Sequence, residues 1–383
     1  MKGRVLAALI AAGWTATAFA QSGEGLENLQ FHGFATQAVV ASSNNNYLGM
    51  DSRSLSAAWT EAALNINDQV SDQLRVGVQF HYTRLGAFGG DQVSVDWALG
   101  DYTVKPWLGV RAGKVKIRWG LYNDTQDYDP GYLWSLLPEP IYAVDWRATD
   151  LSQLGAEAYG SVYLGRKLGE ASYSAYYGSY YEASNDGVME DFTEEGESFK
   201  SPPGGKTPGF DLRWMTPVTG LKVGGSLMAY NAKGNLINGT FQQPTAYWPT
   251  GYAEYRRGKL FASGQYAKLV EYDVSTETGS APEIDTSDER AWFVMGGYRI
   301  TDKLQAGAYY THYVDASGND TSDPGNYFRD WVASGRYDFN SSFYLKVEGH
   351  FIDGNGVGFY GFDNPNGLQP RTNATVAKLG FTF

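Results

Sequence analysis

Apolar residues recur at every second position from about residue 29 to the end of the chain, in segments of roughly ten residues, the length that a tilted membrane strand needs. In the last segment, Leu379, Phe381 and Phe383 fall on one face of an extended strand. The opposite face carries Lys378 and Thr382. This alternation predicts an all-β protein whose strands each have one apolar and one polar face.

The connections between these segments alternate between short and long. Seven short, turn-like connections fall at 67–72, 105–106, 166–168, 217–220, 258–259, 301–302 and 340–342. Eight long, polar connections fall at 42–53, 85–91, 119–150, 182–208, 231–245, 273–289, 315–326 and 354–370. Together they separate sixteen strands, and an even number of strands with short turns at one rim and long loops at the other is typical of an outer-membrane β-barrel. A barrel of this size encloses an aqueous channel.

A soluble β-sandwich is the alternative fold that also has alternating strands. Two features favour a transmembrane antiparallel barrel instead. Aromatic residues gather near strand ends, where an interfacial girdle would lie: Trp107, Tyr163, Tyr298, Tyr337 and Phe339. The polar faces of many strands also carry charged side chains, which a dry sandwich core would not tolerate unpaired.

The 383-residue chain begins with the three parts of a secretory signal. Lys2 and Arg4 precede an apolar run, and Ala18-Phe19-Ala20 gives a small-x-small cleavage pattern. The run is too short to span a bilayer, and no later stretch of about 18 apolar residues exists. We therefore expect a signal peptide over 1–20 and one barrel domain over 21–383, exported to the bacterial outer membrane.

Composition excludes several classes of protein. The chain has no cysteine, which excludes disulfides and Cys-ligated metal sites. Its formal net charge of −12 becomes −14 when Lys2 and Arg4 are removed with the signal, and no basic stripe is present, so a nucleic-acid partner is not expected. The four histidines stand outside any readable catalytic or metal-binding motif. The sequence therefore predicts no enzyme, no metal site and no cofactor.

The chain resembles the trimeric sixteen-stranded porins of Gram-negative outer membranes. The resemblance is carried by the signal peptide, by the terminal strand 377–383 that ends on Phe383, and by the stretch 111–124. That stretch is similar to a segment of phosphate-selective-type porins, with Arg118-Trp119 in place of their usual Pro-Phe. The resemblance implies a homotrimer surrounded by lipid and lipopolysaccharide, an assembly signal at Phe383, and a third extracellular loop that folds into the lumen.

The long connection 119–150 is the candidate for that third loop. Its many aromatic and apolar residues would be unusual on an exposed loop. Five acids would place negative charge near the constriction: Asp124, Asp127, Asp129, Glu139 and Asp145. Trp119, Trp134 and Trp146 are candidate stacking surfaces for sugars or aromatic solutes. The alternative is a loop that packs over the barrel mouth or against a neighbouring subunit.

Three cations alternate along the fifth strand, so they share one face: Lys114, Lys116 and Arg118. A bulge near Ala112-Gly113 would turn this face into the lumen, beside Arg75 and Arg213, and would give a basic ladder with modest anion preference. The alternative is that the three side chains lie at the outer rim, in contact with lipopolysaccharide phosphates.

Taken together, the sequence predicts a porin that lets small hydrophilic solutes and ions diffuse passively across the outer membrane. A channel selective for sugars or anions is the first alternative. A barrel enzyme that uses His350, or a surface receptor, is the second. The acidic run Glu190, Asp191, Glu194, Glu195 and Glu197 is read as a solvated surface patch, with divalent-cation binding as an alternative.

Overall fold

The computed structural model describes residues 28–317 and 320–383, so the expected signal peptide lies outside the described residues. Its strands are β1 (Leu29–Ser42), β2 (Ser56–Gln69), β3 (Leu74–Leu85), β4 (Phe88–Lys105), β5 (Leu108–Lys116), β6 (Ser152–Gly165), β7 (Gly169–Tyr181), β8 (Gly204–Met215), β9 (Leu221–Leu236), β10 (Gly239–Arg257), β11 (Leu260–Glu277), β12 (Glu283–Arg299), β13 (Leu304–Asp315), β14 (Tyr327–Asp338), β15 (Phe343–Asp353) and β16 (Arg371–Thr382). Two short helices lie in the connections, α2 (Arg147–Asp150) and α3 (Gly187–Glu194). Three 3₁₀ turns span Ser52–Ser54, Asp129–Gly131 and Pro324–Asn326.

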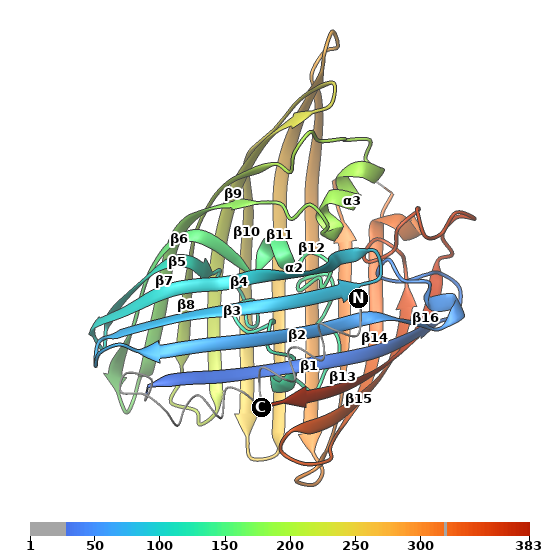
Figure 1. The fold of residues 1–383 in the computed structure, drawn as a ribbon. Coiled ribbons are helices and arrows are strands. Elements are labelled where there is room, and N and C mark those ends of the chain that lie inside the picture. Colours follow the sequence, from blue (N-terminus) through green and yellow to red (C-terminus); the bar gives the residue numbers. More distant parts are fainter. Residues whose placement is uncertain (1–27, 318–319) are drawn as a thin grey trace.

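The strands form one closed antiparallel barrel in which each strand pairs with its neighbours in the sequence (Figure 1). The seam is made by β1 and β16, which pair from Phe34 opposite Thr382 to Ser42 opposite Ala374. The backbones of Gly33 and Phe383 extend this seam by exchanging two hydrogen bonds, of 3.0 and 3.1 Å. The predicted barrel of sixteen antiparallel strands is therefore confirmed.

Burial along the strands is the reverse of that in a soluble protein. On β15, the apolar side chains of Val347 and Phe351 are exposed on the outer face. The charged side chains of Lys346 and Glu348 are completely buried on the inner face. An outside that is apolar and an inside that is polar suit a barrel surrounded by lipid, because only the enclosed face can hydrate or pair its charges.

The rim with the short turns carries exposed aromatic side chains. Trp107, Tyr163, Tyr298, Tyr337 and Phe339 are each at least two-fifths exposed there, as an interfacial girdle requires. We call this rim, which also holds Gly33 and Phe383, the inner end, and the opposite rim the outer end. Among the described residues, no helix is both long and apolar enough to cross a bilayer.

Three of the eight expected long loops are tight turns instead. The connections predicted at 85–91, 231–245 and 273–289 shrink because β3, β4 and β9 to β12 continue beyond the alternating segments. Figure 1 shows the long hairpins of β9 to β12 projecting at the top of the view. Strands that leave the apolar region have water on both faces, so their sequence loses the alternation that marks a membrane strand.

Candidate functional site

The segment 117–151, called the third loop below, leaves the barrel wall after Lys116 because β5 is only nine residues long. Its side chains pack against inner-face side chains of the opposite wall. The indole of Trp119 lies on that of Trp248 with ring centroids 4.4 Å apart, and its Nε1 donates to the Trp248 carbonyl at 2.8 Å. The hydroxyls of Tyr122 and Ser263 are hydrogen-bonded at 2.7 Å. These contacts run from the β5 side of the barrel to β10 and β11.

A buried ionic cluster fixes the loop to β15 and β16. The carboxylate of Asp129 lies 3.0 Å from Lys346 Nζ and 3.1 Å from Lys378 Nζ, and it accepts a hydrogen bond from the Tyr344 hydroxyl at 2.6 Å. Burial by itself would raise the pKa of Asp129, but the two ammonium groups outweigh it and hold this pKa below its ordinary value. Asp129 therefore anchors the third loop. Because two ammonium groups neutralise its charge, it contributes little to the electrostatic field in the lumen.

Backbone groups at positions 134–136 of the third loop are hydrogen-bonded to side chains of β15. The Glu348 carboxylate accepts hydrogen bonds from the backbone N–H groups of Ser135 and Leu136, at 3.1 and 3.0 Å. Lys346 Nζ also donates to the carbonyl of Trp134 at 2.8 Å. Charge-assisted bonds of this kind are stronger than neutral ones, so this stretch of loop is tightly fixed.

The other end of the loop is fixed to β3 and β4. Arg147, on α2, lies 2.6 Å from the carboxylate of Asp96. Burial alone would lower the pKa of Arg147, but Asp96 outweighs it and raises this pKa. Gln79 donates to Asp96 at 3.0 Å and to Asp127 of the loop at 2.7 Å. The third loop is thus bonded to inner-face side chains on both sides of the barrel.

Lys114, Lys116 and Arg118, which were expected to share one face, do not lie on the same face of the barrel wall. The expected shift in strand register near Gly113 is absent, because β5 pairs without a break with β4 and β6 through this region. Lys114 pairs with Ala98 and with the exposed Leu154, and its Nζ donates to the Val95 carbonyl at 2.6 Å. The expectation that Lys114 faces the lumen is therefore wrong: unbroken alternation keeps it on the outer face.

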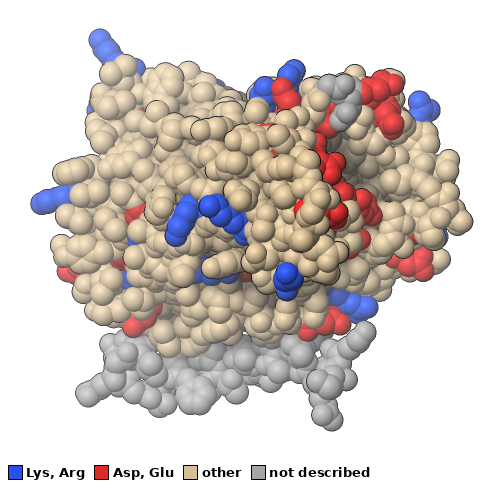
Figure 2. Space-filling view, turned by 90° about the horizontal axis from the view of Figure 1, so that it is seen from above, with Lys and Arg blue, Asp and Glu red and all other residues tan. Residues whose placement is uncertain are grey.

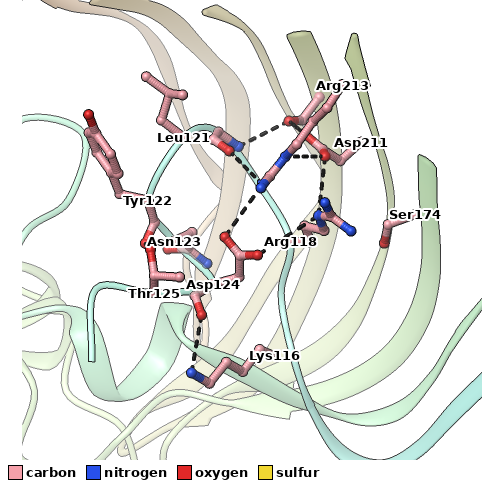
Figure 3. Close-up of polar contacts among 12 residues, drawn as sticks. Lys116, Arg118, Leu121, Tyr122, Asn123, Asp124, Thr125, Ser174, Asp211 and Arg213 are labelled. Atoms are coloured by element: carbon pink, nitrogen blue, oxygen red, sulfur yellow. Dashed lines mark hydrogen bonds and ion pairs between the residues drawn. The ribbon is translucent and has the colours of Figure 1, made fainter. Parts of the chain in front are cut away.

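Lys116 and Arg118 turn inward because the chain leaves the wall at this point. Lys116 Nζ lies 2.6 Å from the carboxylate of Asp127, and Arg118 Nε lies 3.4 Å from Asp211 and 3.8 Å from Asp124. Figure 3 shows Lys116, Arg118, Asp124 and Asp211 converging around the start of the loop.

Arg213, on β8, joins the same cluster. Its guanidinium lies 2.8 Å from Asp211 and 3.4 Å from Asp124, and it also donates to the carbonyl of Gly120 at 3.1 Å (Figure 3). Three cations, Lys116, Arg118 and Arg213, are therefore matched by three acids, Asp124, Asp127 and Asp211. We call these six residues the constriction cluster.

A cavity of about 240 Å³, the inner cavity, lies between this cluster and the inner end of the barrel. Arg75 and Arg111 line it, and both pair with Asp101, at 3.2 and 3.0 Å. Arg111 also lies 3.0 Å from Glu157. Every charged residue that lines the inner cavity is a member of an ion pair.

A larger cavity of about 420 Å³, the outer cavity, lies on the opposite side of the third loop. Eleven carboxylates line it: Glu139, Asp145 and Asp150 of the third loop; Glu182, Asp191, Glu194 and Glu195 of the connection 182–203, the fourth loop; and Glu271, Asp273, Asp285 and Glu289 of β11 and β12. No Lys, Arg or His lines this cavity, and none of the eleven forms an ion pair within the described part of the chain. In Figure 2, acidic side chains gather in one area of the surface seen from above.

The loop carboxylates of the outer cavity are hard to ionise. Burial raises the pKa of Glu182 to about 8, with Asp150 adding to the effect, and burial raises the pKa of Asp150 to about 7. Burial, and then the neighbouring Asp285, raise the pKa of Glu195 to about 7. Within residues 28–317 and 320–383, no cation opposes these effects at any of the three groups. The cavity therefore gains negative charge as the pH rises through neutrality.

Two of the three candidate stacking tryptophans are unavailable to a solute. Trp119 and Trp134 are buried, the first on Trp248 and the second against Phe261 and Tyr309. The sequence pattern could not separate an aromatic residue that lines a pore from one that packs a loop. Of the three, Trp146 lines the outer cavity, and Trp134 lines a cavity of about 40 Å³, which is too small for a sugar.

Two further sequence expectations concern single residues. His350 is fully buried, and its ring nitrogens lie 2.6 Å from Asp330 and 3.2 Å from Glu348. Phe383 closes the seam with Gly33 and stacks on Phe381 with ring centroids 5.8 Å apart. No group of three or more His, Asp or Glu side chains in residues 28–317 and 320–383 is arranged to hold a metal ion.

Sequence reasoning missed the residues that hold the loop and complete the cluster. Lys346, Lys378 and Asp211 fall on polar strand faces, but nothing local to them shows that they meet a loop far away in the chain. Arg111 is the clearer omission. It alternates with the outward Val110 and Ala112, so the period-two pattern alone could have placed it in the lumen.

No family model matches the chain, and no curated protein matches its sequence. Its fold is similar to OmpT, an outer membrane protein of Vibrio cholerae in trimer form, at 13% identity over 93% of this chain and 99% of that chain, with a TM-score of 0.57. It is similar to the outer membrane channel DcaP of Acinetobacter baumannii, at 12% identity over 93% and 97% of the two chains, TM-score 0.55. It is also similar to Salmonella typhi OmpF in complex with daunomycin, at 14% identity over 93% and 97%, TM-score 0.58. The chain thus has the fold of the sixteen-stranded outer-membrane porins.

Proposed function

We propose that this protein is an outer-membrane channel through which small hydrophilic solutes and ions diffuse passively, with the third loop and the constriction cluster as its narrowest part. One observation carries the proposal: a closed barrel with an apolar outside has, on either side of an anchored internal loop, two cavities lined by charged side chains. A polar, water-filled path flanked by fixed charges selects solutes without a tight binding site.

The charge balance supports a weak preference for cations over anions. Lys114, one of the cations expected to favour anions, lies on the outer face. Lys116, Arg118 and Arg213 each form an ion pair with a carboxylate. The outer cavity, in contrast, carries carboxylates that have no counter-charge in the part of the chain that the structure describes. A one-sided field at the entrance concentrates ions of the opposite sign.

The proposal includes residence in the outer membrane as a homotrimer, after removal of a signal peptide over 1–20. Support comes from the exposed apolar and aromatic outer surface and from similar barrels described as outer-membrane proteins, one of them in trimer form. Cross-linking in detergent would test the trimer, and a product that is only monomeric would contradict it.

Planar-bilayer recording tests the central claim. Purified, folded protein should give discrete conductance steps, and the reversal potential in a salt gradient should report weak cation preference. Folding is checked independently by heat-modifiable gel mobility. A folded, inserted protein that gives no steps would overturn the channel and favour a receptor or structural role.

A further inference from the structure

We propose that an anionic phospholipid binds at the inner end of the barrel, with its phosphate groups on the two adjacent turns that connect β10 to β11 and β12 to β13. Four exposed cations of these turns form what we call the inner basic patch: Arg257, Lys259, Arg299 and Lys303. The inference goes beyond the channel function, because a lipid can bind to the rim of a folded barrel whether or not the barrel conducts.

The first argument is a local excess of positive charge. The whole chain has a net charge of −12, but the two turns, 257–260 and 299–304, hold the four cations and a single acid, Asp302. Within the described residues, no member of the inner basic patch forms an ion pair. The neighbouring Arg256 differs, because it pairs with Glu254 at 2.9 Å. Unpaired cations gathered at one rim attract an anion from outside the chain.

The second argument is the placement of the two turns. β11 and β12 are paired neighbours, and the backbone N–H of Arg299 donates to the carbonyl of Lys259 at 2.9 Å. Adjacent strands lie about 4.8 Å apart, so the centres of the two turns are about 10 Å apart, and long side chains from both can reach one headgroup.

Backbone carbonyls also position the two ammonium groups of the patch. Lys259 Nζ donates to the carbonyl of Ile300 at 3.3 Å, and Lys303 Nζ donates to the carbonyl of Phe339 at 3.3 Å. An ammonium group has three donors, so both lysines keep donors for phosphate oxygens. Hydrogen bonds from a cation to a phosphate are among the stronger ones in proteins.

The third argument is the apolar surface beside the patch, which distinguishes a lipid from a soluble polyanion. Leu260, Tyr298, Ile300, Leu304 and Phe339 are each more than one-third exposed next to the four cations. Tyr298 and Phe339 belong to the aromatic girdle, which lies where headgroups meet acyl chains. A ligand that has both phosphate and acyl chains can use the cations and this surface together.

Other turns of the same rim show that the positive charge is localised. The β2–β3 turn, 70–73, contains Asp72 and no Lys or Arg, and the β8–β9 turn, 216–220, contains no charged residue. The β6–β7 turn carries two adjacent exposed cations, Arg166 and Lys167. That turn offers a control in which the same charge can be removed elsewhere on the rim.

Native mass spectrometry of the folded barrel in mild detergent tests the inference, with tetraoleoyl cardiolipin, which has two phosphates, as the probe. The native protein should retain it, and phosphatidylcholine with the same acyl chains, which is zwitterionic, should bind at least about tenfold more weakly. Lys259→Gln/Lys303→Gln should weaken cardiolipin binding about tenfold or more, because each cation near a lipid headgroup adds to the attraction. Arg166→Gln/Lys167→Gln, the matched control, should bind as the native protein does.

Binding that is weakened in the first variant and kept in the control supports the site, whether or not the protein conducts in a bilayer. Absence of binding to the native protein, equal loss in the control, or equal binding of phosphatidylcholine overturns it. Complete displacement of cardiolipin by equimolar inorganic phosphate, or by soluble peptidoglycan fragments, would assign the patch to a different ligand and overturn the lipid. If the first variant fails to fold, Arg257→Gln/Arg299→Gln offers a second pair in the same patch.

Dependence on salt sharpens the test. The four cations are exposed, so their attraction for phosphate is screened by ions in solution. Cardiolipin retention should therefore fall when ammonium acetate is raised from about 0.05 M to about 0.5 M, while phosphatidylcholine retention should stay the same. Cardiolipin retention that is unchanged over this range would contradict the role of the patch.

Discussion

The two cavities of the barrel differ in how their buried charges are compensated. In the inner cavity, Arg75 and Arg111 share Asp101, and the constriction cluster beside them holds equal numbers of cations and acids. In the outer cavity, acids from loops and strands meet without a cation among the described residues. Paired charges keep a fixed field over a wide range of pH and salt. Unpaired buried carboxyls instead respond to pH, to salt and to any ligand that carries positive charge.

The largest expected effect comes from detaching the third loop, which separates the two cavities. Asp129→Asn leaves Lys346 and Lys378 close together without the carboxylate that they share. Breaking a buried ion pair costs about 3–5 kcal/mol, so the loop should detach from β15 and β16. Single-channel recording should then show larger and noisier steps, and the folded band on gels should be lost at lower temperature. Asp320→Asn, at an exposed loop carboxyl, is the control. Equal changes in both variants would contradict the anchor.

A smaller effect is expected from the constriction cluster. Lys116→Gln/Arg118→Gln removes the cation that pairs with Asp127 and leaves Asp124 with Arg213 alone, so the permeability ratio should move toward cations by about two- to fivefold at about 0.1 M salt, where fields still reach about 10 Å. Lys114→Gln should leave the reversal potential unchanged, because this side chain lies on the outer face. A shift in Lys114→Gln as large as in the double variant would show that the strand-five assignment is wrong.

The pH dependence of selectivity separates the two cavities further. A carboxyl with a raised pKa is neutral below that pKa and charged above it, so the outer cavity becomes more negative as the pH rises past about 7 and 8. Cation preference should therefore increase by about twofold between about pH 6 and about pH 9. Asp150→Asn/Glu182→Gln/Glu195→Gln should flatten this profile. A native profile that is already flat would show that these groups do not act on permeating ions.

The smallest expected effect concerns solute stacking. Because Trp119 and Trp134 are buried, Trp146 is the one of the three candidate tryptophans that lines the outer cavity. Trp146→Leu should change the relative rates of liposome swelling for sugars and amino acids of equal size by less than about twofold. This is below the effect of a full aromatic contact, about 0.5–1.5 kcal/mol, because a diffusing solute is not held on the ring. A larger, sugar-specific loss would restore the sugar-selective channel as the better interpretation.

The fold was predictable because alternation in a membrane strand depends on lipid and water, which act on every residue in the same way. Val347 against Lys346 shows this: each side chain alone predicts its face. The site was predictable only in part. That Asp129 meets Lys378 depends on a tertiary path across the barrel, and no local pattern encodes it. The lumen position predicted for Lys114 depended on a bulge near Gly113. The structure has no shift of register there, and Lys114 donates to a backbone carbonyl on the outer face.

The seam between the first and last strands also determines when folding can finish. Thr382 donates a side-chain hydrogen bond to Gly33, 349 residues away in the chain, and Phe383 bonds to the same residue. Contacts of such long range carry the greatest loop-closure entropy and form slowly. Until β16 is in place, β1 and β15 each keep an unpaired edge that can join another chain. Pairing of β16, the last dozen residues, is therefore the slow step that closes the barrel. Loss of these residues should leave an aggregation-prone open sheet instead of a smaller barrel.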